Sequence, residues 1–241
     1  MTERLPSFLI IGAVKAATTW ITAQLQEHPG IFMPSPEPHF FSTDFERGLD
    51  HYRGLFGPAA PAQLIGEKSA DYLAHPDAPA RAAALLPAAR LVVQLRNPVE
   101  RAYSDYKMLY RRGTISGPPA EYLRPGSEQP RFLDSGRYAE HLARWLDHFP
   151  ADQLHVVLYE DVRTAPRETL ARVCEYIGAP PFYSEAIGTR PVNDGAAALL
   201  PLGLRRWMAP FKPLARPLRG TAGFEKVRGL LARDVAYPLL E

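Results

Sequence analysis

The stretch FLIIGAVKAATTW, residues 8–20, decides the fold class. Four apolar residues that favour strands lead to Gly12, a short loop carries Lys15, and a helical pattern begins at Thr18, which we expect to cap that helix. A strand, a tight turn and a helix in this order open an α/β fold. The turn is P-loop-like, because backbone N–H groups at the start of a helix and a nearby lysine suit the binding of a phosphate.

Further along the chain, apolar runs alternate with helical patterns. Strands are predicted at residues 31–33, 64–68, 90–96 and 154–159, and the third of these runs is nearly continuous, as in the interior of a parallel sheet. The main helices are predicted at residues 77–86, 97–112 and 164–177, and residues 113–131 are expected to form a loop. Five apolar residues are expected to share one face of a further helix: Tyr138, Leu142, Trp145, Leu146 and Phe149. The pattern predicts a doubly wound, mainly parallel sheet with helices on both faces.

Composition limits the class of protein. The 241 residues, 46% hydrophobic and 22% charged, fit one domain over residues 1–241, with residues 188–241 as a candidate lid or acceptor-facing tail. A net charge of +2 argues against a nucleic-acid partner, and a single cysteine excludes an intramolecular disulfide. No apolar run approaches the roughly 20 residues of a membrane span, and no leader is evident at the N-terminus, so we expect a cytoplasmic protein. The sequence does not give its oligomeric state.

A second motif, RNPVERAYSDY, occupies residues 96–106. Asn97 is the predicted cap of the helix that follows, and Glu100 completes a capping-box pattern. Arg96 stands at the carboxyl end of the clearest strand, where α/β sheets bind ligands, so Arg96 and Ser104 are candidates to grip one phosphate. The alternative reading makes Arg96 a surface ion-pair partner and Ser104 an ordinary helix residue, and Lys15 a solvated lysine in a plain turn.

Taken together, the motifs resemble a known family. Residues 12–20 look like the 5′-phosphosulfate-binding loop of sulfotransferases that use 3′-phosphoadenosine-5′-phosphosulfate (PAPS), and residues 96–106 are similar to their 3′-phosphate-binding segment. The sequence PEPHFF at residues 36–41 matches the Glu-x-x-Phe-Phe segment of the heparan-sulfate branch, and GEKSADY at residues 66–72 resembles its Glu-Lys-Thr/Ser-Pro segment. These four motifs, in the expected order, span residues 8 to about 110, and a weaker similarity extends to about residue 180.

The resemblance implies a role for each matching residue. Lys15 would hold the 5′-phosphosulfate and stabilise the leaving phosphate, Arg96 and Ser104 would bind the 3′-phosphate, Glu37 would be the general base, and Lys68 would lie near the transferred sulfuryl group. Four more residues would contact the 5′-phosphosulfate: Ala16, Ala17, Thr18 and Thr19. The implied donor is PAPS, the product is adenosine 3′,5′-bisphosphate, and no metal is expected. The acceptor would be a hydroxyl, or less favourably an amine, of a sugar, a glycosylated metabolite or another small molecule.

Departures from the family pattern leave alternatives open. Ala17 stands where the family usually has a glycine, Pro36 where the heparan branch has a cation, and Ala70 where it has a proline, so the acceptor class is not fixed. His39 is the rival base, because two positions along an extended segment face the same side. A P-loop-like kinase would need ATP with Mg²⁺, but Ala16 follows Lys15 where a P-loop has a hydroxyl. The other alternative is a non-catalytic nucleotide-binding module.

Overall fold

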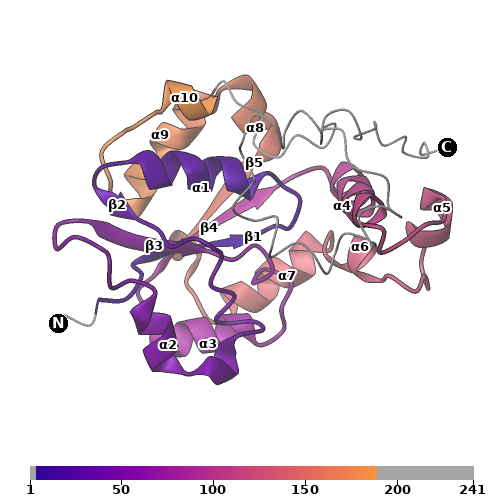
Figure 1. Cartoon of the computed structure of the whole chain (residues 1–241), viewed down its shortest axis with the longest axis horizontal. Helices are drawn as coiled ribbons and strands as arrows, with labels where there is room; N and C mark the ends of the chain where they lie inside the picture. The colour runs from indigo at the N-terminus through magenta and orange to yellow at the C-terminus, as the bar shows by residue number, and fades with distance from the viewer. Residues whose placement is uncertain (1–3, 189–241) are drawn as a thin grey trace, which may run out of the picture.

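The computed structural model of the chain describes residues 4–188 and contains a five-stranded sheet (Figure 1). The strands are β1 (Phe8–Gly12), β2 (Ile31–Phe32), β3 (Leu64–Lys68), β4 (Arg90–Leu95) and β5 (Leu154–Leu158). Their order is β2-β3-β1-β4-β5, and every neighbouring pair is parallel. The prediction of a parallel α/β sheet is therefore confirmed. The proposed tail, apart from Gly188, lies outside the described residues.

Helices cover both faces of the sheet. Along the chain they are α1 (Thr18–Glu27), η1 (Phe45–Arg47), α2 (Leu49–Gly54), α3 (Ala78–Leu85), α4 (Pro98–Arg112), α5 (Pro119–Tyr122), α6 (Arg131–Asp134), α7 (Tyr138–Leu146), η2 (Ala151–Gln153), α8 (Tyr159–Thr164), α9 (Pro166–Ile177) and α10 (Glu185–Gly188). In the described part of the chain, no helix is both long enough and apolar enough to span a membrane.

The strand alternation divides the core into two layers. Leu9 and Ile11 of β1 pack with residues from α2, α3 and α7, whereas Phe8 and Ile10 pack with residues from α1, α8 and α9. All four side chains are fully buried, as expected for a strand covered on both faces. Figure 1 shows α1 and α9 on one side of the sheet and α2 and α3 on the other.

A third cluster forms around α4. Residues 113–131, predicted to be a loop, contain the short helix α5, because Tyr122 packs against Tyr106 of α4 and Phe132 of α6. Arg101 and Asp105 of α4 are fully buried, and Asp105 binds Arg131 through both carboxylate oxygens. This packing fixes the position of α4 and the residues on it.

Some of the predicted helix caps and element ends are confirmed, and others are wrong. Asn97 caps α4 by accepting hydrogen bonds from the backbone N–H groups of Val99 and Glu100, as predicted. The capping box is wrong, because the Glu100 side chain binds Arg96 instead. Leu146 is 44% exposed, so it does not belong to the buried face of α7. Tyr159 starts a helix rather than ending a strand.

The strand order places the candidate motifs at one edge of the sheet. The chain runs from β1 to β2 and β3 on one side and then crosses to β4 and β5 on the other. Ligands of open α/β sheets bind where the winding reverses, at the carboxyl ends of the strands. At those ends of three adjacent strands stand Lys68 on β3, Gly12 on β1 and Leu95 on β4, which is followed by Arg96.

Candidate active site

The turn between β1 and α1 holds the first motif. Gly12 is required there by close packing, because a Cβ would lie 2.9 Å from the Ala70 carbonyl oxygen and 2.8 Å from Leu73 Cβ. Lys15 and Ala17 adopt φ values of 67° and 66°, a left-handed conformation that costs on the order of 1 kcal/mol for residues other than glycine. Such strain persists where the surroundings impose it, commonly at functional sites.

The start of α1 has no side-chain cap. The predicted cap, Thr18, is instead the first residue of the helix, and Ala17 stands at the cap position, where its methyl group offers no acceptor. Thr18 is buried, and its backbone carbonyl oxygen accepts a hydrogen bond from the Thr22 hydroxyl at 2.9 Å. A helix start without a capping side chain is suited to an anion, both by its N–H groups and by its dipole.

Lys15 reaches from this turn to α4. Its Nζ lies 3.8 Å from Met108 Sδ, and burial lowers the pKa of Lys15. The negative charge of Asp105 opposes that shift, whereas three nearby cations add to the lowering of the pKa: Arg112, Arg96 and Lys107. A half-buried lysine surrounded by cations indicates a positive site that favours an anionic ligand.

The two candidates for binding a 3′-phosphate lie on the α4 side of Lys15, and the charge of Arg96 acts on Lys15. Ser104 is one helical turn before Met108, so the two share a face of α4, and Met108 contacts Lys15. The Arg96 guanidinium lies 4.5 Å from the centre of the Tyr159 ring and binds Glu100, with 2.9 Å between Nη2 and Oε2. The ion-pair alternative for Arg96 is thus present, and an anion would compete with Glu100 for this guanidinium.

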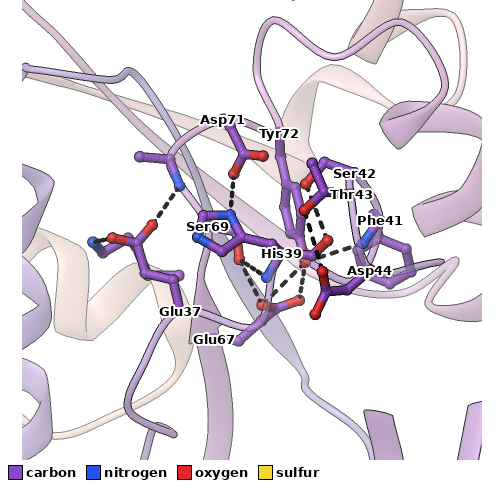
Figure 2. Close-up of polar contacts among 12 residues, drawn as sticks. Glu37, His39, Phe41, Ser42, Thr43, Asp44, Glu67, Ser69, Asp71 and Tyr72 are labelled. Atoms are coloured by element: carbon purple, nitrogen blue, oxygen red, sulfur yellow. Dashed lines mark hydrogen bonds and ion pairs between the residues drawn. The ribbon is translucent and has the colours of Figure 1, made fainter. Parts of the chain in front are cut away.

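Glu37 and Lys68 form an ion pair at the carboxyl end of β3. Lys68 Nζ lies 2.5 Å from Glu37 Oε1, and Glu37 Oε2 accepts a hydrogen bond from the backbone N–H of Ala70 at 3.1 Å. Figure 2 shows both carboxylate oxygens of Glu37 engaged. Lys68 is only 6% exposed, whereas Glu37 is 34% exposed, so the carboxylate is accessible to a substrate while the ammonium lies behind it.

The rival base, His39, lies close to Glu37 but has a different partner. Its Nδ1 is 2.7 Å from Asp71 Oδ1, and its backbone N–H donates to Ser69 Oγ. Glu37 and His39 lie close together, as predicted. The reason given for this was wrong, because His39 has a φ of 50° and the segment is therefore not an extended strand. The donor atoms of Glu37, His39 and Asp71 lie within 4.8 Å of one another, a spacing that a metal ion would accept, but both carboxylates already have partners.

A cleft of about 440 Å³ opens between α1 and the segment that carries Glu37. Thr19 from the first motif, Glu37 and His39 from the third, and Lys68 from the fourth line it together with six other residues: Thr22, Ala23, Gln26, Pro34, Ser35 and Pro36. The second motif, with Arg96 and Ser104, lies on the α4 side and is joined to the first through Lys15. The structure therefore brings all four motifs to one edge of the sheet.

Sequence reasoning missed the role of Glu67. Its side chain is fully buried and accepts hydrogen bonds from Tyr52, Tyr72 and Ser69. Burial raises the pKa of Glu67 to about 7, although these hydrogen bonds oppose the rise. The signal was a carboxylate within a predicted strand of a parallel sheet with helices on both faces, since such a strand is buried on both faces.

The chain is similar in sequence to proteins of one known family. The model of the sulfotransferase family matches residues 55–184, just over half of the chain. The chain is 35% identical over 209 residues to bifunctional heparan sulfate N-deacetylase/N-sulfotransferase 3 of Mus musculus, covering 77% of this chain and 24% of that protein. It is 35% identical over 184 residues to heparan sulfate glucosamine 3-O-sulfotransferase 3B1 of Homo sapiens, covering 73% and 47%. It thus spans about a quarter to a half of these relatives.

Solved structures agree with the fold. A sulfotransferase from Alicyclobacillus acidocaldarius superposes with a TM-score of 0.69 at 27% identity, covering 86% of this chain and 91% of that one. The sulfotransferase domain of the curacin biosynthetic pathway superposes with a TM-score of 0.57 at 16% identity, covering 78% and 80%, and supports the fold alone. Because the family model matches more than half of its residues, the chain belongs to the sulfotransferase family.

Proposed function

We propose that this chain transfers the sulfuryl group of PAPS to a hydroxyl group of a carbohydrate or another small molecule. Family membership gives sulfuryl transfer as the class of reaction. The observation that carries the proposal is the Glu37–Lys68 pair, which places a carboxylate and an ammonium 2.5 Å apart in a cleft that also includes Thr19 of the anion-binding turn. Two relatives, one named for 3-O-sulfation and one for N-sulfation of heparan sulfate, support a carbohydrate acceptor. We favour a hydroxyl because a neutral hydroxyl is a weaker nucleophile than a neutral amine and so gains more from a base that removes its proton as it attacks.

The residues around Lys15 fit the donor. Lys15 and the uncapped start of α1 would hold the 5′-phosphosulfate, with contacts from the turn residues Ala16, Ala17, Thr18 and Thr19. Arg96 and Ser104 would bind the 3′-phosphate, the first by its fork and the second by its hydroxyl. When bound, PAPS supplies the activated sulfuryl group. The lysines supply positive charge at this site, so we propose no metal.

The chemical step follows from these positions. Glu37 would accept the proton of the acceptor hydroxyl while the hydroxyl oxygen forms a bond to sulfur and the bond from sulfur to the 5′-phosphate oxygen breaks. By analogy with phosphoryl transfer, such a reaction has a loose, in-line transition state, so catalysis rests on positioning and on cations where charge develops. Lys68 would leave Glu37 and stabilise the sulfuryl oxygens, and Lys15 would stabilise the charge on the leaving phosphate.

The test is transfer of labelled sulfuryl groups from PAPS to a panel of carbohydrate and small-molecule acceptors. Glu37→Gln should lower kcat by about 10²- to 10⁴-fold, the usual contribution of a general base, while binding of adenosine 3′,5′-bisphosphate is retained. Glu46→Gln, an exposed carboxylate on η1, is the matched control and should keep full activity. Full activity in Glu37→Gln would refute its role as base, and tight binding of ATP with Mg²⁺ in place of the bisphosphate would refute the donor.

The choice of base needs its own comparison. Both side chains line the cleft, but Glu37 contacts Lys68, the cation proposed to stabilise the sulfuryl oxygens, whereas His39 contacts Asp71. His39→Gln should therefore lower kcat less than Glu37→Gln does. Both variants are assayed with the same donor and acceptor, and donor binding is measured by calorimetry. If the loss in His39→Gln exceeds that in Glu37→Gln, the base is His39.

A further inference from the structure

Glu67 is a buried carboxylate immediately before Lys68, with no part in the chemistry proposed above. Successive side chains of a strand point to opposite faces, so Lys68 faces the cleft beside α1 and Glu67 faces α2. Glu67 Oε1 accepts a hydrogen bond from Tyr52 Oη at 2.8 Å and one from Tyr72 Oη at 3.1 Å, and Oε2 accepts one from Ser69 Oγ at 3.2 Å. Figure 2 shows the contacts of Glu67 with Ser69 and Tyr72.

Two of these hydroxyl groups also bind the segment that carries the candidate bases. The backbone N–H of His39 donates to Ser69 Oγ at 2.9 Å, and the backbone N–H of Phe41 donates to Tyr72 Oη at 3.2 Å. An ionised carboxylate only accepts hydrogen bonds, so each hydroxyl hydrogen points at Glu67 and a lone pair is left for the N–H group. Glu67 thereby fixes the direction of both bridges.

Aromatic packing also holds the same segment. Phe40 stacks on the Tyr52 ring with centroids 4.2 Å apart and planes 13° apart. Phe41 meets the Tyr72 ring edge-on at 5.4 Å. The two phenylalanines of the third motif thus pack on the tyrosines that donate to the glutamate of the fourth motif, which couples the two motifs physically.

We propose that Glu67 is a positioning residue that holds residues 37–41 against the end of β3, so that Glu37 and His39 face the cleft. The effect of Glu67 on turnover rests on the proposed function, whereas its role in positioning residues 37–41 does not. Glu67 itself does not line the cleft and acts only through the two hydroxyl bridges.

The hydrogen bonds through which Glu67 positions residues 37–41 should depend on pH. The groups that face Glu67 are Tyr52 from α2 and three residues after β3: Ser69, Asp71 and Tyr72. Burial raises the pKa of Glu67 to about 7, and the charge of Asp71 adds to the rise. A protonated Glu67 must donate its hydrogen to one of the hydroxyls, which then turns its own hydrogen away. Where that hydroxyl is the one of Ser69 or Tyr72 rather than of Tyr52, one bridge changes direction as the pH falls through about 7.

The experiment measures amide hydrogen exchange by NMR on the full chain, with three variants. Ser69→Ala should speed exchange at His39 N–H alone, Tyr72→Phe at Phe41 N–H alone, and Glu67→Gln at both, each by about tenfold, the effect of one weakened hydrogen bond. Tyr52→Phe, which touches Glu67 but neither bridge, is the matched control and should leave both amides unchanged. Unchanged exchange at both amides in folded Glu67→Gln would overturn the proposal.

Turnover gives the second measurement. Glu67→Gln should lower kcat by about tenfold or more while the KM for PAPS changes less than about twofold, because a displaced base slows the chemical step without disturbing the donor turn. A limb of the kcat profile near pH 7 should be present in the unsubstituted chain and absent in the variant. Equal kcat in the two proteins would overturn the link to catalysis. An unsubstituted chain that transfers no sulfuryl group would instead refute the proposed function, and the exchange result would still decide the role of Glu67 in holding the segment.

Discussion

Replacing Glu67 by glutamine should change how the stability of the protein depends on pH. Burial raises the pKa of Glu67 from 4.5 to about 7, so between these values the native protein holds a proton that the unfolded chain has released. The free energy of unfolding therefore decreases as the pH rises through this window. A rise of this size corresponds to about 3 kcal/mol, and the decrease is complete above about pH 7.

The assay is urea denaturation at pH 5, 6, 7 and 8, on the unsubstituted chain and on Glu67→Gln. The difference between their unfolding free energies isolates Glu67, because other groups contribute equally to both proteins. His141 and His155 are two such groups: burial lowers the pKa of each, so both raise stability as the pH rises. The difference should shift by about 3 kcal/mol in favour of the variant between pH 5 and pH 8.

The refuting result is a difference that does not change with pH. It would mean that the Glu67 carboxyl titrates at its ordinary value and that burial does not penalise its charge. The prediction also separates positioning from simple structural support. At pH 8 the variant should have lower turnover without a matching loss of stability, whereas a residue that only supports the fold would lose both.

Three further substitutions, one of them with a control variant, test the turn and the sheet. Lys15→Ala should weaken binding of adenosine 3′,5′-bisphosphate roughly tenfold or more and abolish transfer, since it removes a charged donor. Lys107→Ala on α4 should weaken binding much less, and equal losses by calorimetry would remove Lys15 from the site. Ala17→Gly should stabilise the protein by up to about 1 kcal/mol, because Ala17 holds a φ of 66°; a lower urea midpoint would contradict this. Gly66→Ala should destabilise it by about 1–3 kcal/mol, because the new methyl group would overlap the buried Phe8 ring, and an unchanged melting temperature would show that the ring can move.

Much of the secondary structure could be predicted from local patterns. The strands at residues 8–12 and 64–68 were predicted with the observed limits. The first is a short apolar run, as is typical of a buried parallel strand, whereas the second contains Glu67 and Lys68. Asn97 was identified as a cap because its side chain and the backbone that it caps are adjacent in sequence. The helix α5 was not predicted, since it is held by contacts of Tyr122 with residues distant along the chain.

In the candidate site, too, some features could be predicted from the sequence and others depended on the tertiary structure. Sequence alone identified the residues that we propose carry the chemistry: Lys15 in a turn before a helix, Arg96 after a strand, and Glu37 and Lys68 in recognisable motifs. Only the tertiary structure decided their partners. Lys68 binds Glu37 across 31 positions of sequence, and the buried Glu67 binds hydroxyls from two separate elements. The physical reason is that a strand's apolar pattern is local, whereas the contacts of its carboxyl end depend on the strand order β2-β3-β1-β4-β5.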